Sequence, residues 1–522
     1  MSNNISSLRA ASACVRVPHV SLVLILLLAA LLRGLALGDI PNGFYHDEAF
    51  VGYDAYSMVE TWRDQYGEFL PFFARADGFY NESLYRYATA LSVAVCGLSE
   101  FSTRVPAAIV GVLNVWCLFA LVRTWFDRDL ALMAAFFLAI SPWHIQFSRV
   151  AVSAIFLPLC FCLALWLFGK ALKRPNYLLP CAAAFAATLY TYSSARVFVP
   201  LFMLGLLCLF WREVYQQKGK TLIAGLFFAV VFFLLFTFWI TPEGMARART
   251  VLSTDYLSIP LYYLSYFNPL FLFYDGDPNL RHSIWYMGQL YHCELLFVPL
   301  GLWGLYKDRG KTSAVMWLWL ALYPIPAAFT EAEHSLRAIV GAPLFAILSA
   351  YGLKVTSGAC SSFRAKRSLM LVVVAVLAVN FGVYCNFYFV DYPVYGARAW
   401  QYGMKQAISY IRENGYGKVI MGHVPVPHIF VLFYTHFPPE EYHEFPLEWR
   451  QKLWRARGVP VGFGGFYFSV VESLELPPGK ALLIAEPADV EVVAAKGYAH
   501  RKLHSFKDPA GVEVLSLLEI RH

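Results

Sequence analysis

Hydrophobic residues occur along this chain in long blocks, separated by short segments that hold most of the charged residues. Neither the period of two typical of a half-buried strand nor the narrow stripe of a soluble amphipathic helix describes these blocks. A helix needs about 20 apolar residues to cross a bilayer. We therefore predict about eleven transmembrane helices, near residues 20–38, 105–122, 130–146, 154–169, 178–194, 197–211, 221–240, 291–306, 313–330, 337–354 and 369–389.

The composition agrees with a polytopic membrane protein, because 58% of the residues are hydrophobic, only 15% are charged and the mean hydropathy is +0.51. A net charge of +7 could indicate nucleic acid binding. The basic residues, however, lie in short clusters between apolar blocks, as the positive-inside rule describes, and we set nucleic acid aside. The first block, Val20 to Leu37, lacks a small-residue cleavage site before Asp39, so we expect a retained anchor rather than a cleaved signal peptide.

One apolar segment, Tyr85 to Leu98, is left out of the span count because its roughly 14 residues suit an interfacial or re-entrant segment. With this segment excluded, the basic loops fall on the same side as Arg9 and Arg16, which the positive-inside rule assigns to the cytoplasm. The opposite, external side then receives the C-terminal tail and the loops 39–104, 143–153, 241–290 and 331–336.

Composition changes in the tail, where charged residues return. Short apolar runs at Lys418 to Met421 and Ala481 to Ala485 predict strands, and the pattern from Ala399 to Ile411 predicts a helix. The predicted fold is thus an α-helical polytopic membrane domain over residues 1–390, followed by a small extramembrane α/β domain over residues 391–522.

The first external loop begins with candidate chemistry in Gly43-Phe44-Tyr45-His46-Asp47-Glu48-Ala49. Two adjacent carboxylates and an imidazole follow the first apolar block by only a few residues. A carboxylate at the membrane surface, partly shielded by aromatic neighbours, could have the raised basicity that a general base requires. The alternative is that acids in an external loop are simply solvated.

Four arginines lie on the predicted external side beside the ends of spans: Arg149, Arg196, Arg281 and Arg337. The guanidinium fork matches the geometry of phosphate oxygens. Snorkelling of the side chain to the interface is the alternative. Because four such arginines run against the positive-inside trend, an anionic ligand at the external interface is their simplest common cause.

Several short motifs follow one another on this side of the membrane. They are His46-Asp47-Glu48-Ala49, Arg104-Val105-Pro106, Ser141-Pro142-Trp143-His144 leading to Arg149, Gly276-Asp277-Pro278-Asn279-Leu280-Arg281-His282, and Leu336-Arg337-Ala338. In order and placement they resemble the GT-C superfamily of integral membrane glycosyltransferases, in particular the bacterial branch related to protein O-mannosyltransferases and to the aminoarabinose transferase of lipid A. The resemblance covers roughly residues 20–390.

This resemblance implies an inverting glycosyltransferase of the cell inner membrane, with its active site and tail domain on the extracytoplasmic side. The donor would be a sugar on a polyprenyl phosphate, and the acceptor a glycan, lipid or protein. The residues implied are Asp47 as the base with Glu48 as adjoining acid, Arg149, Arg196 and Arg337 for the donor phosphate, and His46, Arg281 and His282 for donor or acceptor.

The sequence departs from the family pattern in two places, one where relatives carry a lysine for the donor phosphate and one where they carry an acid that could bind a metal. Relatives often carry Lys-Pro-Pro-Leu or His-Pro-Pro-Leu late in the first loop, where this chain reads Asn81-Glu82-Ser83-Leu84-Tyr85-Arg86. Many also have an acid soon after the arginine of the second external loop, where this chain reads Arg149-Val150-Ala151-Val152-Ser153. We therefore expect a metal-independent enzyme without a cofactor, although Glu331 and Glu333 leave a divalent ion open.

Two other functions remain open at this point. A transporter or flippase for a lipid-linked sugar would prefer ionisable residues at mid-membrane and Gly- or Pro-broken spans in repeated positions. The charges here gather instead at one interface, which favours an enzyme. The second alternative is an inactive relative that only binds polyprenyl phosphate, against which the presence of Asp47 argues.

Overall fold

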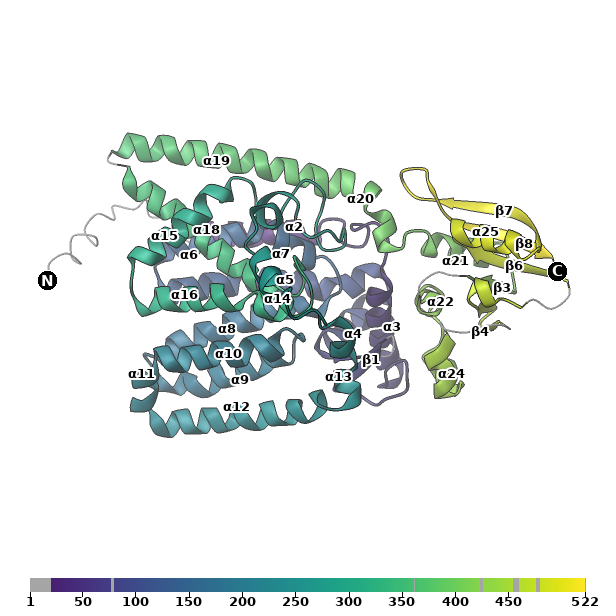
Figure 1. Cartoon of the computed structure of the whole chain (residues 1–522), viewed down its shortest axis with the longest axis horizontal. Helices are drawn as coiled ribbons and strands as arrows, with labels where there is room; N and C mark the ends of the chain where they lie inside the picture. The colour runs from purple at the N-terminus through teal and green to yellow at the C-terminus, as the bar shows by residue number, and fades with distance from the viewer. Residues whose placement is uncertain are drawn as a thin grey trace.

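The computed structural model describes residues 20–76, 79–360, 362–422, 426–453, 460–475 and 479–521. A bundle of lengthwise helices makes up most of it, and a smaller α/β domain lies at one end of the bundle (Figure 1). Arg9 and Arg16, on which the predicted orientation partly rests, lie outside the described residues.

Each of the eleven predicted ranges contains a helix. These are α2 (Val20–Gly34), α5 (Glu100–Trp125), α6 (Arg128–Ile140), α8 (Phe156–Ala171), α9 (Leu178–Leu189), α10 (Ala195–Leu209), α12 (Lys218–Trp239), α15 (Glu294–Lys307), α16 (Lys311–Leu322), α18 (Ala342–Ala359) and α19 (Phe363–Asn386). Among the described residues, 5 helical segments are long and apolar enough to cross a membrane, namely 100–125, 153–171, 218–239, 339–359 and 363–395. The bundle is therefore of the membrane type, and the count of eleven spans stays a prediction.

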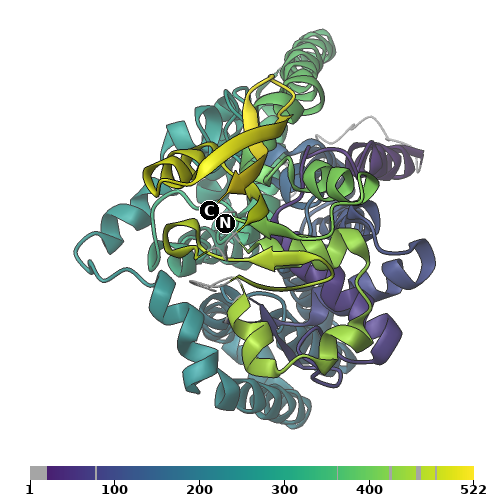
Figure 2. The ribbon, with the colours of Figure 1, turned by 90° about the vertical axis from the view of Figure 1, so that its right-hand side faces the viewer.

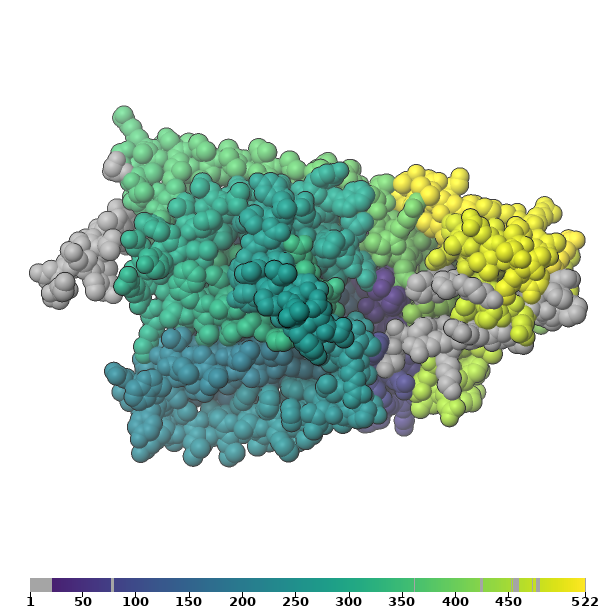
Figure 3. Space-filling view, in the orientation of Figure 1, coloured from purple at the N-terminus to yellow at the C-terminus, as the bar shows by residue number. Residues whose placement is uncertain are grey.

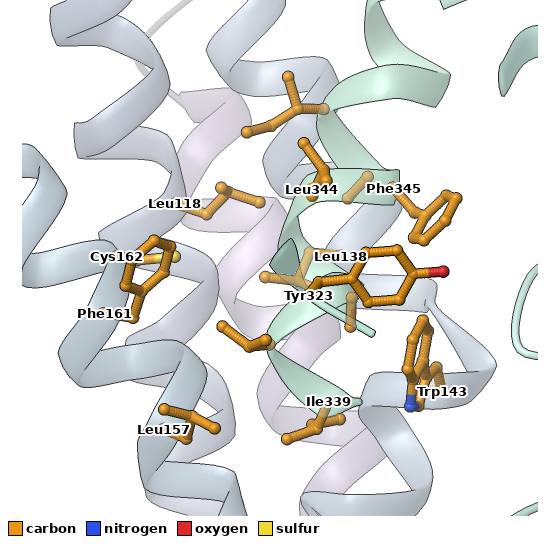
Figure 4. Packing of buried hydrophobic residues seen from close by; sticks show 14 of the residues in the cluster. Leu118, Leu138, Trp143, Leu157, Phe161, Cys162, Tyr323, Ile339, Leu344 and Phe345 are labelled. Carbon is orange, nitrogen blue, oxygen red and sulfur yellow. The ribbon is translucent and has the colours of Figure 1, made fainter. Parts of the chain in front are cut away.

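The centre of the bundle is a close-packed apolar core (Figure 4). Phe161 of α8 meets Trp319 of α16 edge to face, with 4.7 Å between ring centroids, and Leu344 of α18 is fully buried. Glycine lets α15 and α18 touch, because a Cβ added to Gly352 would lie 1.9 Å from the carbonyl oxygen of Phe297. Small residues that permit close backbone approach are a common packing device in membrane bundles.

The first external loop folds at the end of the bundle nearest the α/β domain (Figure 1). It contains α3 (His46–Thr61), a hairpin of β1 (Phe73–Ala76) and β2 (Phe79–Glu82), and α4 (Leu84–Cys96). The 13 residues of α4 extend about 20 Å, less than the roughly 30 Å of a hydrocarbon core. Leu91 and Val95 are exposed while Tyr85 and Arg86 are buried, so α4 has the two-faced pattern of an interfacial helix.

Shorter elements connect the main helices. They are α7 (Pro142–Phe147), η1 (Ser153–Ile155), η2 (Pro175–Tyr177), α11 (Trp211–Gln216), α13 (Pro242–Val251), α14 (Ile259–Ser265), η3 (Leu270–Tyr274), α17 (Ile325–Ala328) and η4 (Ile339–Gly341). Hydrogen bonds join the loops that were predicted to share the external side: Ala151 to Glu48 (2.9 Å), Gln146 to Arg281 (2.7 Å) and Ser335 to Asp277 (2.8 Å). These loops therefore meet at one end of the bundle, while the side of the membrane they face stays a prediction.

The chain leaves the bundle through η5 (Phe387–Asp391), α20 (Tyr392–Tyr395) and η6 (Ala397–Trp400). A six-stranded sheet follows in the order β4-β5-β3-β6-β8-β7, in which β3 is parallel to β5 and β6. Its strands are β3 (Val419–Met421), β4 (Val461–Phe463), β5 (Phe466–Phe468), β6 (Lys480–Ala485), β7 (Ala499–Lys507) and β8 (Glu513–Arg521). The helices are α21 (Met404–Glu413), α22 (Pro427–Thr435), α23 (Pro439–Glu444), α24 (Leu447–Lys452), η8 (Val471–Ser473) and α25 (Pro487–Ala495). The predicted strands at 418–421 and 481–485 are confirmed. The helix predicted over 399–411 begins later, at Met404, and ends at Glu413, because Gln401 and Gly403 adopt positive φ and interrupt the helical conformation.

The α/β domain packs directly on the first external loop. Viewed from the domain end, its elements lie over the ends of the bundle helices (Figure 2), and the first loop lies where the two parts meet (Figure 3). Phe44 contacts Phe433 with 4.7 Å between ring centroids, and the Tyr53 hydroxyl donates to the carbonyl of Phe437 at 2.8 Å. One apolar cluster thus includes both α3 and the domain.

His428 of α22 is buried in this shared cluster, between Phe50 and Phe468, whose ring centroids lie 6.0 and 6.2 Å away. Burial, together with the charge of His46, lowers the pKa of His428 from 6.5 to about 3. The folded protein therefore keeps this imidazole neutral at pH values where the unfolded chain protonates it. The stability linked to this group is present above pH 6.5 and falls as the pH drops below that value.

We expect the free energy of unfolding to fall by about 2 kcal/mol more in the wild type than in His428→Leu when the pH is lowered from about 7.5 to about 5. Urea unfolding of the detergent-solubilised protein at both pH values measures this difference. The same loss in both proteins would contradict the role of His428.

Candidate active site

Asp47 and Glu48 occupy the first turn of α3, where the partial positive charge of the helix N-terminus stabilises carboxylates. Successive helix residues point about 100° apart, so the two side chains face different surroundings. The Asp47 side chain is 66% exposed, whereas Glu48 is buried. Of the two predicted acids, only Asp47 is accessible to a ligand.

Glu48 forms a buried ion pair with Arg104 of α5. Arg104 donates through Nε to Oε1 and through Nη2 to Oε2, both at 2.9 Å, and the Ala151 N–H donates to Oε1 at 2.9 Å. Arg104 also donates to the carbonyls of Pro41 and Gly43 at 3.1 and 2.8 Å. Both oxygens of Glu48, the predicted adjoining acid, are therefore already held by Arg104 and Ala151.

Arg149, predicted to bind phosphate, is completely buried. Its Nη1 donates to the Leu32 carbonyl at 2.8 Å, and its Nη2 donates to the carbonyls of Leu35 and Ile40 at 2.8 and 3.0 Å. The ring of Phe389 covers the guanidinium at 5.1 Å. Leu32 lies in the last turn of α2, where carbonyls lack helical partners, and Leu35 and Ile40 follow the end of the helix. Arg149 therefore caps α2, and its guanidinium does not face a ligand space.

The motif Ser141-Pro142-Trp143-His144 is also buried and holds a polar network within the bundle. Arg33 of α2 donates through Nη2 to His144 Nδ1 at 2.8 Å and through Nη1 to the Ala139 carbonyl at 2.9 Å. Asn114 lies 2.8 Å from His144 Nε2. Arg33 is not among the residues predicted from the sequence, although an arginine inside an apolar block was its signal.

Arg281 differs from these arginines because its guanidinium reaches the surface that carries Asp47. The guanidinium carbon lies 3.7 Å from the ring centre of Tyr45, two residues before Asp47. Gln146 holds the Arg281 carbonyl at 2.7 Å. Among the ion pairs between described residues, Arg281 has no carboxylate partner, so its charge is available to an anion. His46 is fixed at the same place, with its N–H and Nδ1 each 2.9 Å from Gln401 Oε1.

Arg337 and Arg196 lie further along this end of the bundle, each with a carboxylate partner. Arg337 Nη1 lies 2.5 Å from Glu331, whose side chain is 54% exposed. Arg196 Nη2 lies 2.8 Å from Glu82, which is buried. Ser194 connects the two segments by donating to the Arg337 carbonyl at 3.0 Å. Because Glu331 is exposed and Glu82 is buried, an anion can replace the carboxylate partner of Arg337 more easily than that of Arg196.

Asp277, His282 and His334 form a cluster whose ligand atoms lie within 4.8 Å of one another. Such a set could hold a divalent ion. Asp277 Oδ2 already accepts hydrogen bonds from the Ser335 N–H (2.8 Å) and Oγ (3.0 Å), and it lies 2.9 Å from His282 Nδ1. Burial opposes the ionisation of Asp277, but His282 and His334 outweigh it and lower the pKa of Asp277. In this arrangement the cluster fixes the loop that carries Arg281. Its possible metal ligands, Asp277, His282 and His334, differ from Glu331 and Glu333, which the sequence suggested.

Arg86 belongs to the segment that stands where relatives often carry Lys-Pro-Pro-Leu or His-Pro-Pro-Leu. It is buried and pairs with the buried Asp54, with 2.7 Å between Nε and Oδ2. The nearby Asp64 accepts hydrogen bonds from the backbone of Tyr66 and Glu68 at 2.9 Å. Burial and the charge of Asp54 raise the pKa of Asp64 to about 7. Asp54 and Asp64 therefore hold the fold of the first loop through buried contacts, and they do not lie on its exposed surface.

Comparisons with known proteins agree with the predicted resemblance. Residues 83–240 match the family described as dolichyl-phosphate-mannose-protein mannosyltransferase. No curated protein sequence matches the chain.

Several solved structures share the fold over 95% of this chain. One is the Archaeoglobus fulgidus oligosaccharyltransferase tethered with an acceptor peptide, with a TM-score of 0.53, 13% identity and 73% of that chain covered. Another is ArnT from Cupriavidus metallidurans, with 12% identity and 97% of its chain covered, at TM-scores of 0.53 bound to undecaprenyl phosphate and 0.55 in the apo state. The chain therefore has the fold of these membrane transferases and resembles ArnT and the protein mannosyltransferases, as its motifs predicted.

Glu48→Gln should destabilise the protein, because it leaves Arg104 buried without a counterion. Breaking a buried pair in this way typically costs about 3 to 5 kcal/mol. Asp47→Asn removes the same charge one residue away at an exposed site, where we expect a change within about 0.5 kcal/mol. Thermal unfolding of both variants in one detergent measures the contrast. Equal melting temperatures would show that the Glu48 pair does not support the fold.

Proposed function

We propose that this protein is an inverting glycosyltransferase that moves a sugar from a polyprenyl-phosphate donor to an acceptor hydroxyl or amine. The observation that carries this proposal is that the guanidinium of Arg281 lies over Tyr45, two residues before the exposed carboxylate of Asp47. A carboxylate can take the acceptor proton, and a guanidinium can hold the phosphate of the leaving group.

The relatives support a donor of this class. The family that matches residues 83–240 is named for a mannose carried on dolichyl phosphate, and the ArnT with this fold has been solved with undecaprenyl phosphate. The oligosaccharyltransferase with this fold was captured with an acceptor peptide. A polyprenyl phosphate is therefore the carrier we assign to the donor, and the acceptor class stays open among glycan, lipid and protein.

The transfer would be a single displacement. Asp47 takes the proton of the acceptor O–H or N–H while that oxygen or nitrogen attacks the anomeric carbon of the sugar. The bond between this carbon and the phosphate oxygen breaks, and its electron pair leaves with the lipid phosphate. Because attack comes from the face opposite the leaving group, the configuration inverts. The exposed position of Asp47 lets the proton pass on to water.

The leaving phosphate gains negative charge during this step, which nearby cations stabilise. We assign this role to Arg281, with Arg337 exchanging its exposed partner Glu331 for the phosphate. Arg196 keeps a buried carboxylate partner and lies behind Arg337. We expect no step to need a divalent ion, with Asp277 and His282 holding the loop of Arg281 in place.

The site would lie at the extracytoplasmic face of the cell inner membrane. The loops that form it share one end of the bundle with the α/β domain, and the basic connections such as Lys170 to Arg174 belong to the other end. The positive-inside rule assigns that other end to the cytoplasm. The α/β domain, which contacts His46 through Gln401, then borders the space where an acceptor would approach.

Asp47→Asn should lower the turnover number of sugar transfer by about 100-fold to 10,000-fold, because a neutral amide does not accept the acceptor proton. A panel of polyprenyl-phosphate hexoses and pentoses labelled in the sugar, with extracted glycans, lipids and peptides as acceptors, measures transfer. The matched control is Asp39→Asn, an exposed acid of the same loop, which should transfer like the wild type. Wild-type turnover in Asp47→Asn would show that the base is wrong.

Arg281→Ala should weaken the binding of undecaprenyl phosphate by roughly 10-fold to 150-fold, the loss expected when one charge-assisted contact worth about 1.5 to 3 kcal/mol is removed. Equilibrium titration of the purified protein with this lipid measures the change. Arg249→Ala removes an exposed arginine of α13 and should bind like the wild type. If the two variants bind equally well, Arg281 does not contact the phosphate.

A further inference from the structure

A cavity lies at the end of the bundle remote from Asp47. It has a volume of about 610 Å³ and lies between the C-terminal turns of α5 and α8 and the short helix η2. Its lining includes Arg123 from α5, Lys170 from α8, and Lys173 and Arg174 from the connection that follows. Four cations thus surround one cavity, whose lining includes no carboxylate among the described residues.

The lengths of the two long helices place this cavity at the opposite membrane boundary. Arg104, in the first turns of α5, pairs with Glu48 at the active end, and the 26 residues of α5 then rise about 39 Å along the bundle. α8 follows Ala151, which contacts Glu48, and reaches Lys170 at its last turn. The cavity therefore opens at the boundary that the basic loops assign to the cytoplasm.

Two other lysines at this end have carboxylate partners, unlike the four cations of the cavity. Lys311 pairs with Glu213, and Lys354 pairs with Asp127. Among the ion pairs of the described residues, none involves Arg123, Lys170, Lys173 or Arg174. Like charges held around a common cavity repel one another and raise the local concentration of anions. A bound anion would offset the repulsion between these four cations.

Aromatic side chains form the remaining walls and give the cavity a membrane-facing side. The Lys170 ammonium lies 4.0 Å from the ring centre of Trp166 and 5.2 Å from that of Tyr177, which holds it at the cavity. Trp116 packs edge to face on Trp166 at 5.7 Å and is 42% exposed on the outside of α5. Tryptophan is enriched at headgroup level in membrane proteins. The cavity thus combines four cations, three of them exposed at the surface, with an interfacial aromatic rim.

We propose that this cavity binds the phosphate headgroup of an anionic phospholipid of the cytoplasmic leaflet. Basic pockets between transmembrane helices on this side of a membrane recognise anionic headgroups. The volume exceeds what a single phosphate group fills, and the tryptophan rim lies where the glycerol and first acyl carbons of a bound lipid would run. These two features favour a membrane lipid over a soluble phosphate as the occupant. Lipid binding here is independent of glycosyl transfer at the other end.

Native mass spectrometry of the full-length, delipidated protein, titrated with short-chain phosphatidylglycerol, phosphatidylcholine or inorganic phosphate, tests this site. We expect phosphatidylglycerol to bind more tightly than phosphatidylcholine, with inorganic phosphate failing to displace it. The double variant Lys170→Gln/Arg174→Gln should bind phosphatidylglycerol about 10-fold or more weakly, since each surface cation contributes appreciably to anionic lipid binding. The charge-preserving variant Lys170→Arg/Arg174→Lys should bind within about threefold of the wild type.

The matched control is Lys307→Gln/Arg309→Gln, which removes two cations from the α15 end of the same face, outside the cavity. This control should keep wild-type affinity for phosphatidylglycerol. An equal loss in both glutamine variants would mean that the face attracts lipid only through its summed charge. Displacement of the lipid by inorganic phosphate would assign the cavity to a soluble anion. Either result, or equal binding of phosphatidylcholine, overturns the proposal.

Discussion

The ion pair between Glu48 and Arg104 is the interaction on which the active end of the molecule depends. It joins α3 to α5, takes in the Ala151 N–H, and reaches the carbonyls of Pro41 and Gly43 in the segment after α2. A buried pair is stable only when its remaining donors and acceptors are satisfied. That requirement is why several chain segments converge on it. Asp47, one residue away, owes its position to this buried neighbour.

Arginines near the membrane surface serve two different purposes here, and burial separates them. Arg33 and Arg149 donate to carbonyls that backbone hydrogen bonding leaves open at the ends of α2 and α6. In an apolar environment such carbonyls have no water to bond, so a buried guanidinium replaces it. Arg281 and Arg337 instead reach an exposed surface. The first pair builds the scaffold, and the second pair is the one that we propose for the donor phosphate.

The lengths of the apolar blocks were enough to locate the main helices and to set α4 apart from them. The free energy of inserting a helix into lipid depends mainly on its own length and composition, and both can be read from the local sequence. Strand and helix positions in the tail followed from local patterns for the same reason. The roles of Glu48 and Arg149 did not follow. Whether a charged side chain is open or sealed depends on partners from distant segments, such as Ala151 for Glu48 and Leu32 for Arg149. Those contacts exist only in the assembled fold.

The helices at the edges of the bundle, α12 and α19, are the least buried of the long helices (Figure 1). Only 11% and 17% of their most apolar windows are buried, against 61% in α5, and α12 has the highest mean hydropathy of the candidate spans, 2.6. Their stability in lipid comes from their own side chains rather than from neighbours. Helices of this composition can leave the translocon and enter a bilayer without a protein partner. The short helix α15 packs chiefly against α18, which follows it in the chain, so order of synthesis and order of assembly need not coincide.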